Sequence, residues 1–296
     1  ELNKGDALLS LSNAVFWDKS RITPHDDFLD YISSFFTAGA FDLTFKDPNA
    51  LDVINAWVNT STQGRIEKIM EEISPEEVLF IINALYFKDD WKYPFPIEAT
   101  QLRDFTRSDG SIVPTDMMHQ DISTLRFYQG SDFSAVELPF ADSSYTLTLL
   151  LPTASSSPDE LVAELSATRL QSLFDKDLKQ GRILLNMPKF QIEYKLLLND
   201  VLKSMGMQLA FDPNRANLSK LGSAPEGNLY ISRVNHKTYL KVDEKGAEGA
   251  AVTSIGVGVT SLPPQLNFDR PHVFVLRNQG TGSLIFAGKI EDPSGS

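Results

Sequence analysis

The segment that most constrains the fold is residues 78–88, VLFIINALYFK, where β-branched and aromatic side chains follow one another with little polar alternation. A strand of this composition is apolar on both faces, so it must lie inside a sheet that is covered on each side. Elsewhere the apolar spacing changes repeatedly between the strand period and the helix period. This irregular mixture favours an α+β fold over a regular alternation of strands and helices.

Other segments carry their own local signals. Asp47-Pro48 is typical of a helix start, with the aspartate as the cap and the proline at the first helical position. Ser157 and Glu160 form a capping-box pattern ahead of another helix. The remaining predictions are a strand at 7–17, the end of the Asp47 helix near Gly64, paired strands at 136–151, a helix along Leu198, Val201, Leu202 and Met205, and a hairpin at 272–290.

Composition excludes several classes of function. There are 27 Lys and Arg against 39 Asp and Glu, which gives a net charge of −12 and argues against nucleic acid or anionic lipid as a partner. With no cysteine, a disulfide or a thiolate metal site is impossible. The longest nearly apolar run, 78–87, is far shorter than the roughly 20 residues of a membrane-spanning helix.

No catalytic or cofactor motif is present. The four histidines, at 25, 119, 236 and 272, lack metal-ligand spacing to one another, and no G-x-S-x-G or H-E-x-x-H sequence occurs. A Ser/His/Asp hydrolase is an alternative of a different class, and the sequence offers no serine in a nucleophile motif to support it. We therefore predict no metal, no cofactor and no catalytic residue.

One long segment fits neither a helix nor an ordinary strand. Residues 246–261, GAEGAAVTSIGVGVTS, are almost all small or β-branched, carry one charge, and end shortly before Pro263-Pro264. A loop of this length without structure of its own is usually functional. Its high β-propensity and low charge are also typical of segments that add to a sheet as a strand. The segment could thus be an exposed loop, and it could equally become a strand.

Six motifs, spread along the whole chain, can be compared with known families. They are Asn13-Ala14 with Phe16, residues 54–66 (INAWVNTSTQGRI), residues 83–95 (NALYFKDDWKYPF) followed by Thr100 and Phe105, Pro188-Lys189-Phe190, residues 235–246 (NHKTYLKVDEKG) and residues 266–276 (LNFDRPHVFVL). No single motif is specific, but together and in this order they resemble the motifs of the serpin family, the serine protease inhibitors that act by loop insertion.

The resemblance implies a serpin fold, with three β-sheets, surrounding helices and an exposed reactive loop that can insert into the main sheet. It also implies one domain over residues 1–296. The sequence departs from the family pattern at Asp89, where Gly is usual, at Asn217, where Asp is usual, and at His272, where Phe is usual. Because the first residues resemble the end of the family's fourth helix, we expect the N-terminal helices to be missing, as in a fragment or a nicked or truncated form.

The resemblance also assigns a role to segment 246–261, because it implies that the reactive loop lies within residues 244–264. The hinge that begins insertion corresponds to Glu244, Gly246, Ala247, Glu248, Gly249, Ala250 and Ala251. Family spacing from Glu244 places the reactive bond between Thr260 and Ser261, with Val257 and Val259 as alternative cleavage positions. Trp91, Asn83 and His236 match residues where the main sheet opens, and their simpler interpretation is buried polar or packing groups.

In such an inhibitor a protease attacks the loop as a substrate, forms an acyl-enzyme, and is trapped when the cut loop inserts. Because no Lys or Arg lies between Lys245 and Arg270, serine proteases with small apolar pockets, resembling elastase or subtilisin, are the predicted partners, with cysteine proteases also open. The family implies an extracellular or extracytoplasmic monomer. A non-inhibitory serpin with a carrier, storage or chaperone role is the alternative, and the small hinge residues favour the inhibitor.

Overall fold

The computed structural model describes residues 8–225, 227–247 and 263–294. The chain divides into two compact units, which are described separately here. One contains Glu1–Leu8, Lys88–Gln191 and Leu240–Ser296, and the other contains Leu9–Phe87 and Ile192–Tyr239. We call these the first and the second unit.

The second unit holds most of a six-stranded sheet. Its main path runs in the order β10 (Phe190–Leu197), β12 (Arg233–Val242), β4 (Leu79–Asp90), β1 (Leu8–Asp18) and β3 (Gly39–Leu43). The doubly apolar segment 78–88 forms β4, in the middle of this order, as its composition requires. β12 and β4 are parallel neighbours, paired from Arg233 opposite Phe80 to Tyr239 opposite Tyr86. β4 and β12 are therefore directly paired over this length, with no strand between them.

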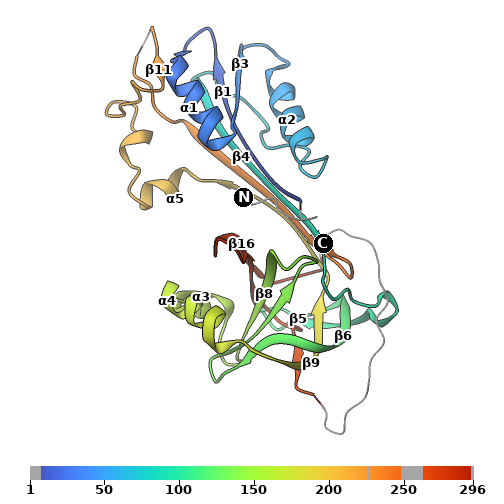
Figure 1. Ribbon diagram of the computed structural model, residues 1–296. Helices are drawn as coiled ribbons and strands as arrows, with labels where there is room; N and C mark the ends of the chain where they lie inside the picture. The colour runs from blue at the N-terminus through green and yellow to red at the C-terminus, as the bar shows by residue number, and fades with distance from the viewer. Residues whose placement is uncertain (1–7, 226, 248–262, 295–296) are drawn as a thin grey trace. The chain divides into compact units, whose positions relative to one another are not determined.

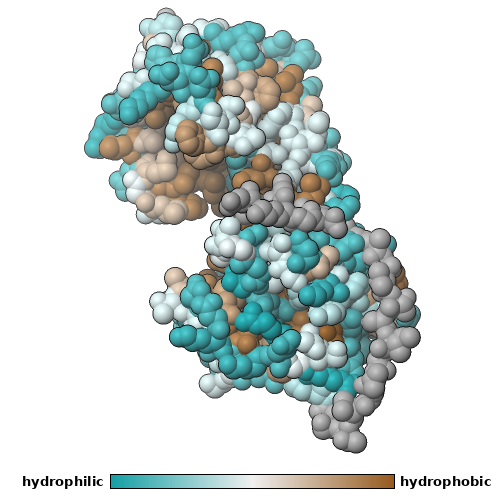
Figure 2. All heavy atoms as spheres, in the orientation of Figure 1, coloured by the Kyte–Doolittle hydropathy of each residue, from teal (hydrophilic) through white to brown (hydrophobic). Residues whose placement is uncertain are grey.

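Helices and a short ribbon complete the second unit. Helices α1 (Asp26–Phe36), α2 (Ala50–Ser61) and α5 (Asn199–Ser204), the 3-10 turn η3 (Leu209–Phe211) and the ribbon of β2 (Thr23–Pro24) with β11 (Gly222–Ser223) surround the sheet. Ile32 of α1 packs with Val15 and Leu79 of the sheet in one apolar cluster. Figure 2 shows apolar side chains, in brown, that remain at the surface of this unit.

The first unit is built on an eight-stranded sheet. Its order is β14 (Gln265–Asn267), β9 (Lys179–Pro188), β6 (Ile112–Gln129), β7 (Phe133–Pro139), β8 (Tyr145–Pro152), β15 (His272–Asn278) and β16 (Leu284–Ile290), with β5 (Gln101–Thr106) paired to β6. The 3-10 turn η1 (Ile97–Ala99) precedes β5. With the six-stranded sheet and the ribbon, the described strands make three sheets with surrounding helices, so the predicted α+β fold is confirmed.

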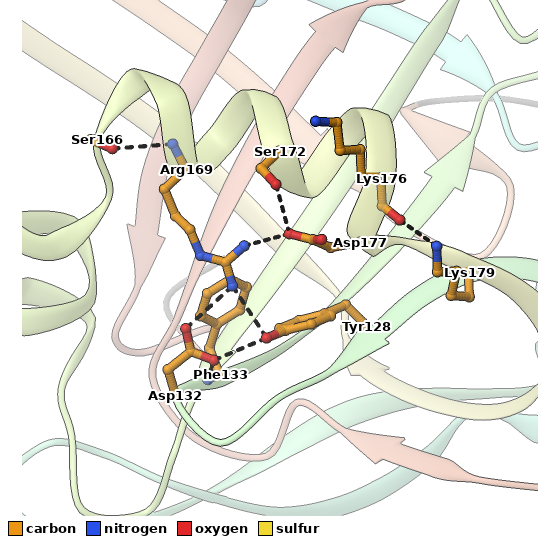
Figure 3. Close-up of polar contacts among 9 residues, drawn as sticks. All are labelled: Tyr128, Asp132, Phe133, Ser166, Arg169, Ser172, Lys176, Asp177 and Lys179. Carbon is orange, nitrogen blue, oxygen red and sulfur yellow. Dashed lines mark hydrogen bonds and ion pairs between the residues drawn. The ribbon is translucent and has the colours of Figure 1, made fainter.

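The side chain of Arg169 connects the helices of the first unit to its sheet (Figure 3). Arg169 lies in α4 (Ala167–Ser172), which follows α3 (Pro158–Glu164) and leads into the π-helical turn η2 (Leu173–Asp177). Its guanidinium donates to Asp177 at 2.6 Å and to Tyr128 and Asp132 of the sheet side at 3.2 and 3.3 Å. The same group lies 5.0 Å from the ring centre of Phe133. Ion pairs and a cation–π contact therefore stabilise this half-buried arginine.

Several local predictions are confirmed and two need correction. The capping box forms, with the Glu160 amide donating to Ser157 Oγ at 3.2 Å and the Ser157 amide donating to Glu160 at 2.8 Å. The helix expected to start at Asp47 starts instead at Ala50, because the Asp47 carboxylate accepts the Asn49 amide and closes a turn before the helix. The apolar face expected on α5 is only partly covered, since Met205 just after it is 76% exposed.

His272 is completely buried in the first unit. Its Nδ1 bonds to the Arg270 carbonyl at 2.8 Å, while Nε2 has no hydrogen-bond partner among the described residues. The rings of Phe268 and Phe105 lie edge-on to it, with centroids 5.2 and 6.3 Å away. Burial lowers the pKa of His272 from 6.5 to about 4, because the charged imidazolium cannot be solvated there.

We expect His272→Phe to abolish an acid-dependent loss of stability. Above pH 6.5 the histidine is neutral in both states. Between pH 6.5 and about 4 only the unfolded chain gains the proton, so the free energy of unfolding falls by up to ~1.4 kcal/mol per pH unit. Urea denaturation of wild type and variant at pH 7.5 and 4.5 measures this difference. His25→Phe, at an exposed histidine, is the control, and an equal effect of both variants would contradict the assignment.

Candidate functional site

The first unit contains a tight reversal of the chain just after β12. Asp243 and Gly246 form an antiparallel bridge, with the Asp243 amide donating to the Gly246 carbonyl at 2.9 Å. The next two residues form β13 (Gly246–Ala247), which pairs antiparallel with the end of β4, Gly246 opposite Asp90 and Ala247 opposite Asp89. The chain that leaves β12 has therefore turned and started back along β4.

Gly246 is required at this reversal for two reasons. Its φ is +144°, a backbone conformation that side chains with a Cβ rarely adopt. A Cβ built there would lie 2.3 Å from the Asp89 carbonyl oxygen and 2.7 Å from the Trp91 amide nitrogen. Ala247, the next residue, is fully buried. Small side chains are thus a structural condition for this pairing.

Trp91 holds the reversal in place. Its indole Nε1 donates to the Asp243 carbonyl at 2.9 Å, and its backbone amide donates to the Lys245 carbonyl at 2.7 Å. The indole ring stacks on Phe140, with centroids 4.4 Å apart and planes 15° from parallel. Trp91 therefore bonds to both sides of the turn, and its stacking on Phe140 fixes the orientation of the ring.

Glu244 anchors the same turn through its side chain. Its buried carboxylate accepts the Thr100 hydroxyl at 2.7 Å and the Lys189 ammonium at 3.0 Å. Burial works to raise the pKa of Glu244, but the hydrogen bonds from Thr100 and Lys189 and the Lys189 charge outweigh it, so this pKa lies below its ordinary value of 4.5. The carboxylate is therefore charged and paired at neutral pH.

We expect Glu244→Gln to lower the free energy of unfolding by about 1–3 kcal/mol at pH 7, since it leaves Lys189 with a weaker partner. The lost contribution is present above about pH 4.5 and disappears as the pH falls below it, because the folded-state pKa is the lower one. Asp116→Asn is the matched control, as this exposed carboxylate lies 3.5 Å from the same ammonium. Guanidinium denaturation of both variants showing equal losses would contradict the special role of Glu244.

In the second unit the structure brings together the two other predicted residues of the sheet. Asn83 and His236 are paired across β4 and β12, with His236 Nδ1 2.6 Å from Asn83 Oδ1. Asn83 Nδ2 also donates to Asn13 Oδ1 of β1 at 2.8 Å. Burial lowers the pKa of His236, so the ring is neutral at neutral pH and Nδ1–H donates to the amide oxygen. These side-chain contacts link three neighbouring strands in addition to the backbone pairing of the sheet.

The partners of Glu244 do not stand out in the sequence. Thr100 and Lys189 belong to other motifs, and they lie 144 and 55 residues away from Glu244. The signal that could have found them is chemical, because a carboxylate next to a buried glycine turn needs a cation and a donor. The sequence alone does not say which of its 27 basic residues that cation is.

Residues 248–262 of the predicted loop lie outside the described residues. This applies to the hinge positions Glu248, Gly249, Ala250 and Ala251, to the reactive bond Thr260–Ser261, and to Val257 and Val259. Within the described ranges, no group of three or more His, Asp or Glu is placed to hold a metal ion. In the same ranges no helix has the length and apolarity needed to cross a membrane.

Comparison with known proteins yields one consistent family. The family model described as serpin (serine protease inhibitor) matches residues 1–293. The chain is 30% identical to Serpin B11 of Homo sapiens, over 99% of this chain and 76% of that protein. It is 31% identical to antithrombin-III of Homo sapiens, over 98% of this chain and 64% of that protein. The chain thus spans about three quarters of the first relative and less than two thirds of the second.

Solved structures give the same picture. The thermophilic serpin tengpin in its native state matches with a TM-score of 0.90 and 30% identity, over 98% of this chain and 75% of that one. Thyroxine-binding globulin in complex with thyroxine matches with a TM-score of 0.88 and 26% identity, over 98% of this chain and 77% of that one. The similar structures therefore include one that is a complex with thyroxine.

Proposed function

The chain belongs to the serpin family of serine protease inhibitors, and we propose that it inhibits proteases as a suicide substrate whose cleaved loop inserts into the main sheet. The observation that carries the proposal is the antiparallel pairing of Gly246 and Ala247 with the end of β4. An inserting strand must run antiparallel to both β4 and β12, and this pair has that direction. This pairing supports the view that the first two residues of the inserting strand are already paired with β4 before cleavage.

Extending the same register gives the path that we propose for the loop. Gly249 would lie opposite Phe87 and Ala251 opposite Leu85, both of which are buried, while Glu248 would lie opposite exposed Lys88. Charged or large side chains could not pass the buried positions, and the sequence has glycine and alanine there. Glu248, the one charged hinge residue after the turn, would then be able to form an ion pair with Lys88.

The chemical steps follow ordinary serine protease chemistry. The protease serine attacks the Thr260 carbonyl carbon, the bond to the Ser261 nitrogen breaks, and the new amino end leaves with the proton from the protease histidine. The loop then carries the acyl-linked protease along β4. Roughly a dozen new hydrogen bonds at ~1 kcal/mol each supply on the order of 10 kcal/mol to distort the protease before water can release it.

We propose proteases with small apolar pockets as targets, because Val257, Val259 and Thr260 offer neither a charge nor an aromatic ring. Elastase-like and subtilisin-like enzymes have this specificity, and cysteine proteases remain candidates. A trypsin-type pocket with a buried aspartate would find no cationic partner in the segment. We further propose that the chain works as an extracellular or extracytoplasmic monomer and forms one serpin domain, as the family resemblance implies.

The alternative is a carrier, and thyroxine-binding globulin is a similar structure that holds a ligand. A panel of elastase, subtilisin, papain and trypsin separates the two functions. We expect a complex with elastase or subtilisin that resists SDS, and mass spectrometry should place the new amino terminus at Ser261. If the proteases of the panel cleave the chain and none forms a stable complex, the carrier function is favoured. A cleavage outside residues 257–261 would contradict the assigned reactive bond.

A further inference from the structure

A cavity in the first unit takes no part in the proposed loop chemistry. It has a volume of about 330 Å³ and lies over one face of the eight-stranded sheet, where β6, β7, β8 and β9 meet the segment that follows Trp91. We propose that this cavity binds a small aromatic anion, a carboxylate or a phosphate monoester. The proposal rests on charges and contacts in the cavity and is independent of loop insertion.

The sheet register places the polar lining side by side. Gln180 of β9 pairs with Arg126 of β6, and Arg126 pairs with Glu137 of β7. Cross-strand partners point to the same face of a sheet, so these three side chains form one row. Lys92 and the Ser143 hydroxyl close the cavity at one side, 3.0 Å apart.

The charges in and behind this row do not balance. The buried Glu137 carboxylate accepts Arg126 at 2.7 Å and also Arg277 at 3.3 Å, so two guanidinium groups share one anion. Lys92 adds a third cation, and it forms no ion pair among the described residues. The cavity lining and the layer behind it thus hold three cations and one carboxylate, in a chain whose net charge is −12. The surplus positive charge is therefore a local feature of this cavity.

Behind the cavity, the buried Arg277 is itself short of acceptors. Its Nε has no hydrogen-bond partner among the described residues, although its guanidinium carbon lies 4.1 Å from the Phe174 ring centre. Buried cationic donors without acceptors are costly, so an added negative charge nearby is stabilised. This observation is independent of Lys92 and points to the same sign of ligand.

The remaining walls define the body of the ligand. Tyr93 and Pro139 give the cavity an apolar side, and Thr124 and Ser143 add hydroxyl groups. Its volume lies at the lower end of the range for small-molecule sites. A flat ring would pack against the apolar side, with its carboxylate or phosphate directed to Lys92 and Arg126. The combination fits an aromatic anion better than a bare inorganic ion.

Isothermal titration of the whole chain with phenyl phosphate, benzoate, benzamide and inorganic phosphate tests the site. We expect the two aromatic anions to bind, and neutral benzamide and inorganic phosphate to bind at least about tenfold more weakly. Lys92→Gln should weaken phenyl phosphate binding about tenfold, since it removes a charged hydrogen bond. Lys176→Gln, an equal charge change at an exposed lysine outside the cavity, should leave the affinity unchanged.

Four results would overturn the proposal. The first three are no heat of binding for either aromatic anion at millimolar concentration, equal binding of benzamide and benzoate, and equal weakening by Lys92→Gln and Lys176→Gln. Inorganic phosphate binding as tightly as phenyl phosphate would show that the apolar side is unused, which also contradicts the assigned ligand class. Thermal denaturation of both variants confirms that they are folded before titration.

Discussion

An Ala251→Arg variant is expected to be cut by its target protease at the normal rate and to trap almost none of it. If the cut loop continues in the register of Gly246 and Ala247, position 251 would lie opposite Leu85, which is 8% exposed. An unpaired guanidinium buried there costs several kcal/mol, and each 1.4 kcal/mol of added barrier slows insertion tenfold. Hydrolysis of the acyl-enzyme would then be faster than loop insertion and would release the protease. The number of inhibitor molecules consumed per trapped protease should therefore rise from about 1 to well above about 10.

Glu248→Arg is the matched control for that experiment. It adds the same side chain three residues earlier, where the same register would place it opposite the exposed Lys88, so water could solvate both charges. We expect trapping close to that of wild type. Equal loss of trapping in both variants would mean that the loop does not follow β4 in this register, and equal trapping by both would mean that it does not enter the sheet at all.

A Thr260→Arg variant is expected to become a trypsin inhibitor. The arginine supplies the charge that pairs with the aspartate at the base of a trypsin-type pocket, an interaction on the order of 2–5 kcal/mol or more when fully desolvated. The rate of SDS-resistant complex formation with trypsin should therefore rise at least about 100-fold, while complex formation with elastase falls. The hinge is unchanged in this variant, so trapping itself should persist.

Thr260→Val is the companion variant, because it retains a small apolar side chain at the same position. It should keep elastase as the target and gain nothing against trypsin. If trypsin cuts Thr260→Arg elsewhere, or cuts after residue 260 without forming a complex, the assigned reactive bond or the trapping step is wrong. Amino-terminal sequencing of the released fragment distinguishes these two cases.

The sequence predicted those parts of the fold that depend on neighbouring residues. Segment 78–88 could only be an interior strand, and the pair Ser157 and Glu160 could only satisfy each other at a helix start. The helix expected at Asp47 began later, since an aspartate two residues before an asparagine can close a turn as well as cap a helix. Local chemistry allowed both, and the surrounding structure selected the turn.

The site was predictable only in outline. Gly246 and Ala247 were identified by their small size, but their pairing with Asp89 and Asp90 joins segments more than 150 residues apart. The salt bridge between Glu244 and Lys189 depends in the same way on how distant strands are brought together. Side-chain type indicates what a residue needs, whereas the sheet topology decides which distant residue supplies it.

Thermal unfolding of the intact and the loop-cleaved chain tests the central claim most directly. If the cut loop becomes a strand between β4 and β12, the cleaved form gains on the order of 10 kcal/mol of stability, and its Tm should rise by about 20 °C or more. The cut is made at Thr260–Ser261 by elastase and checked by mass spectrometry. An unchanged or lower Tm after complete cleavage would contradict loop insertion as the mechanism of this protein.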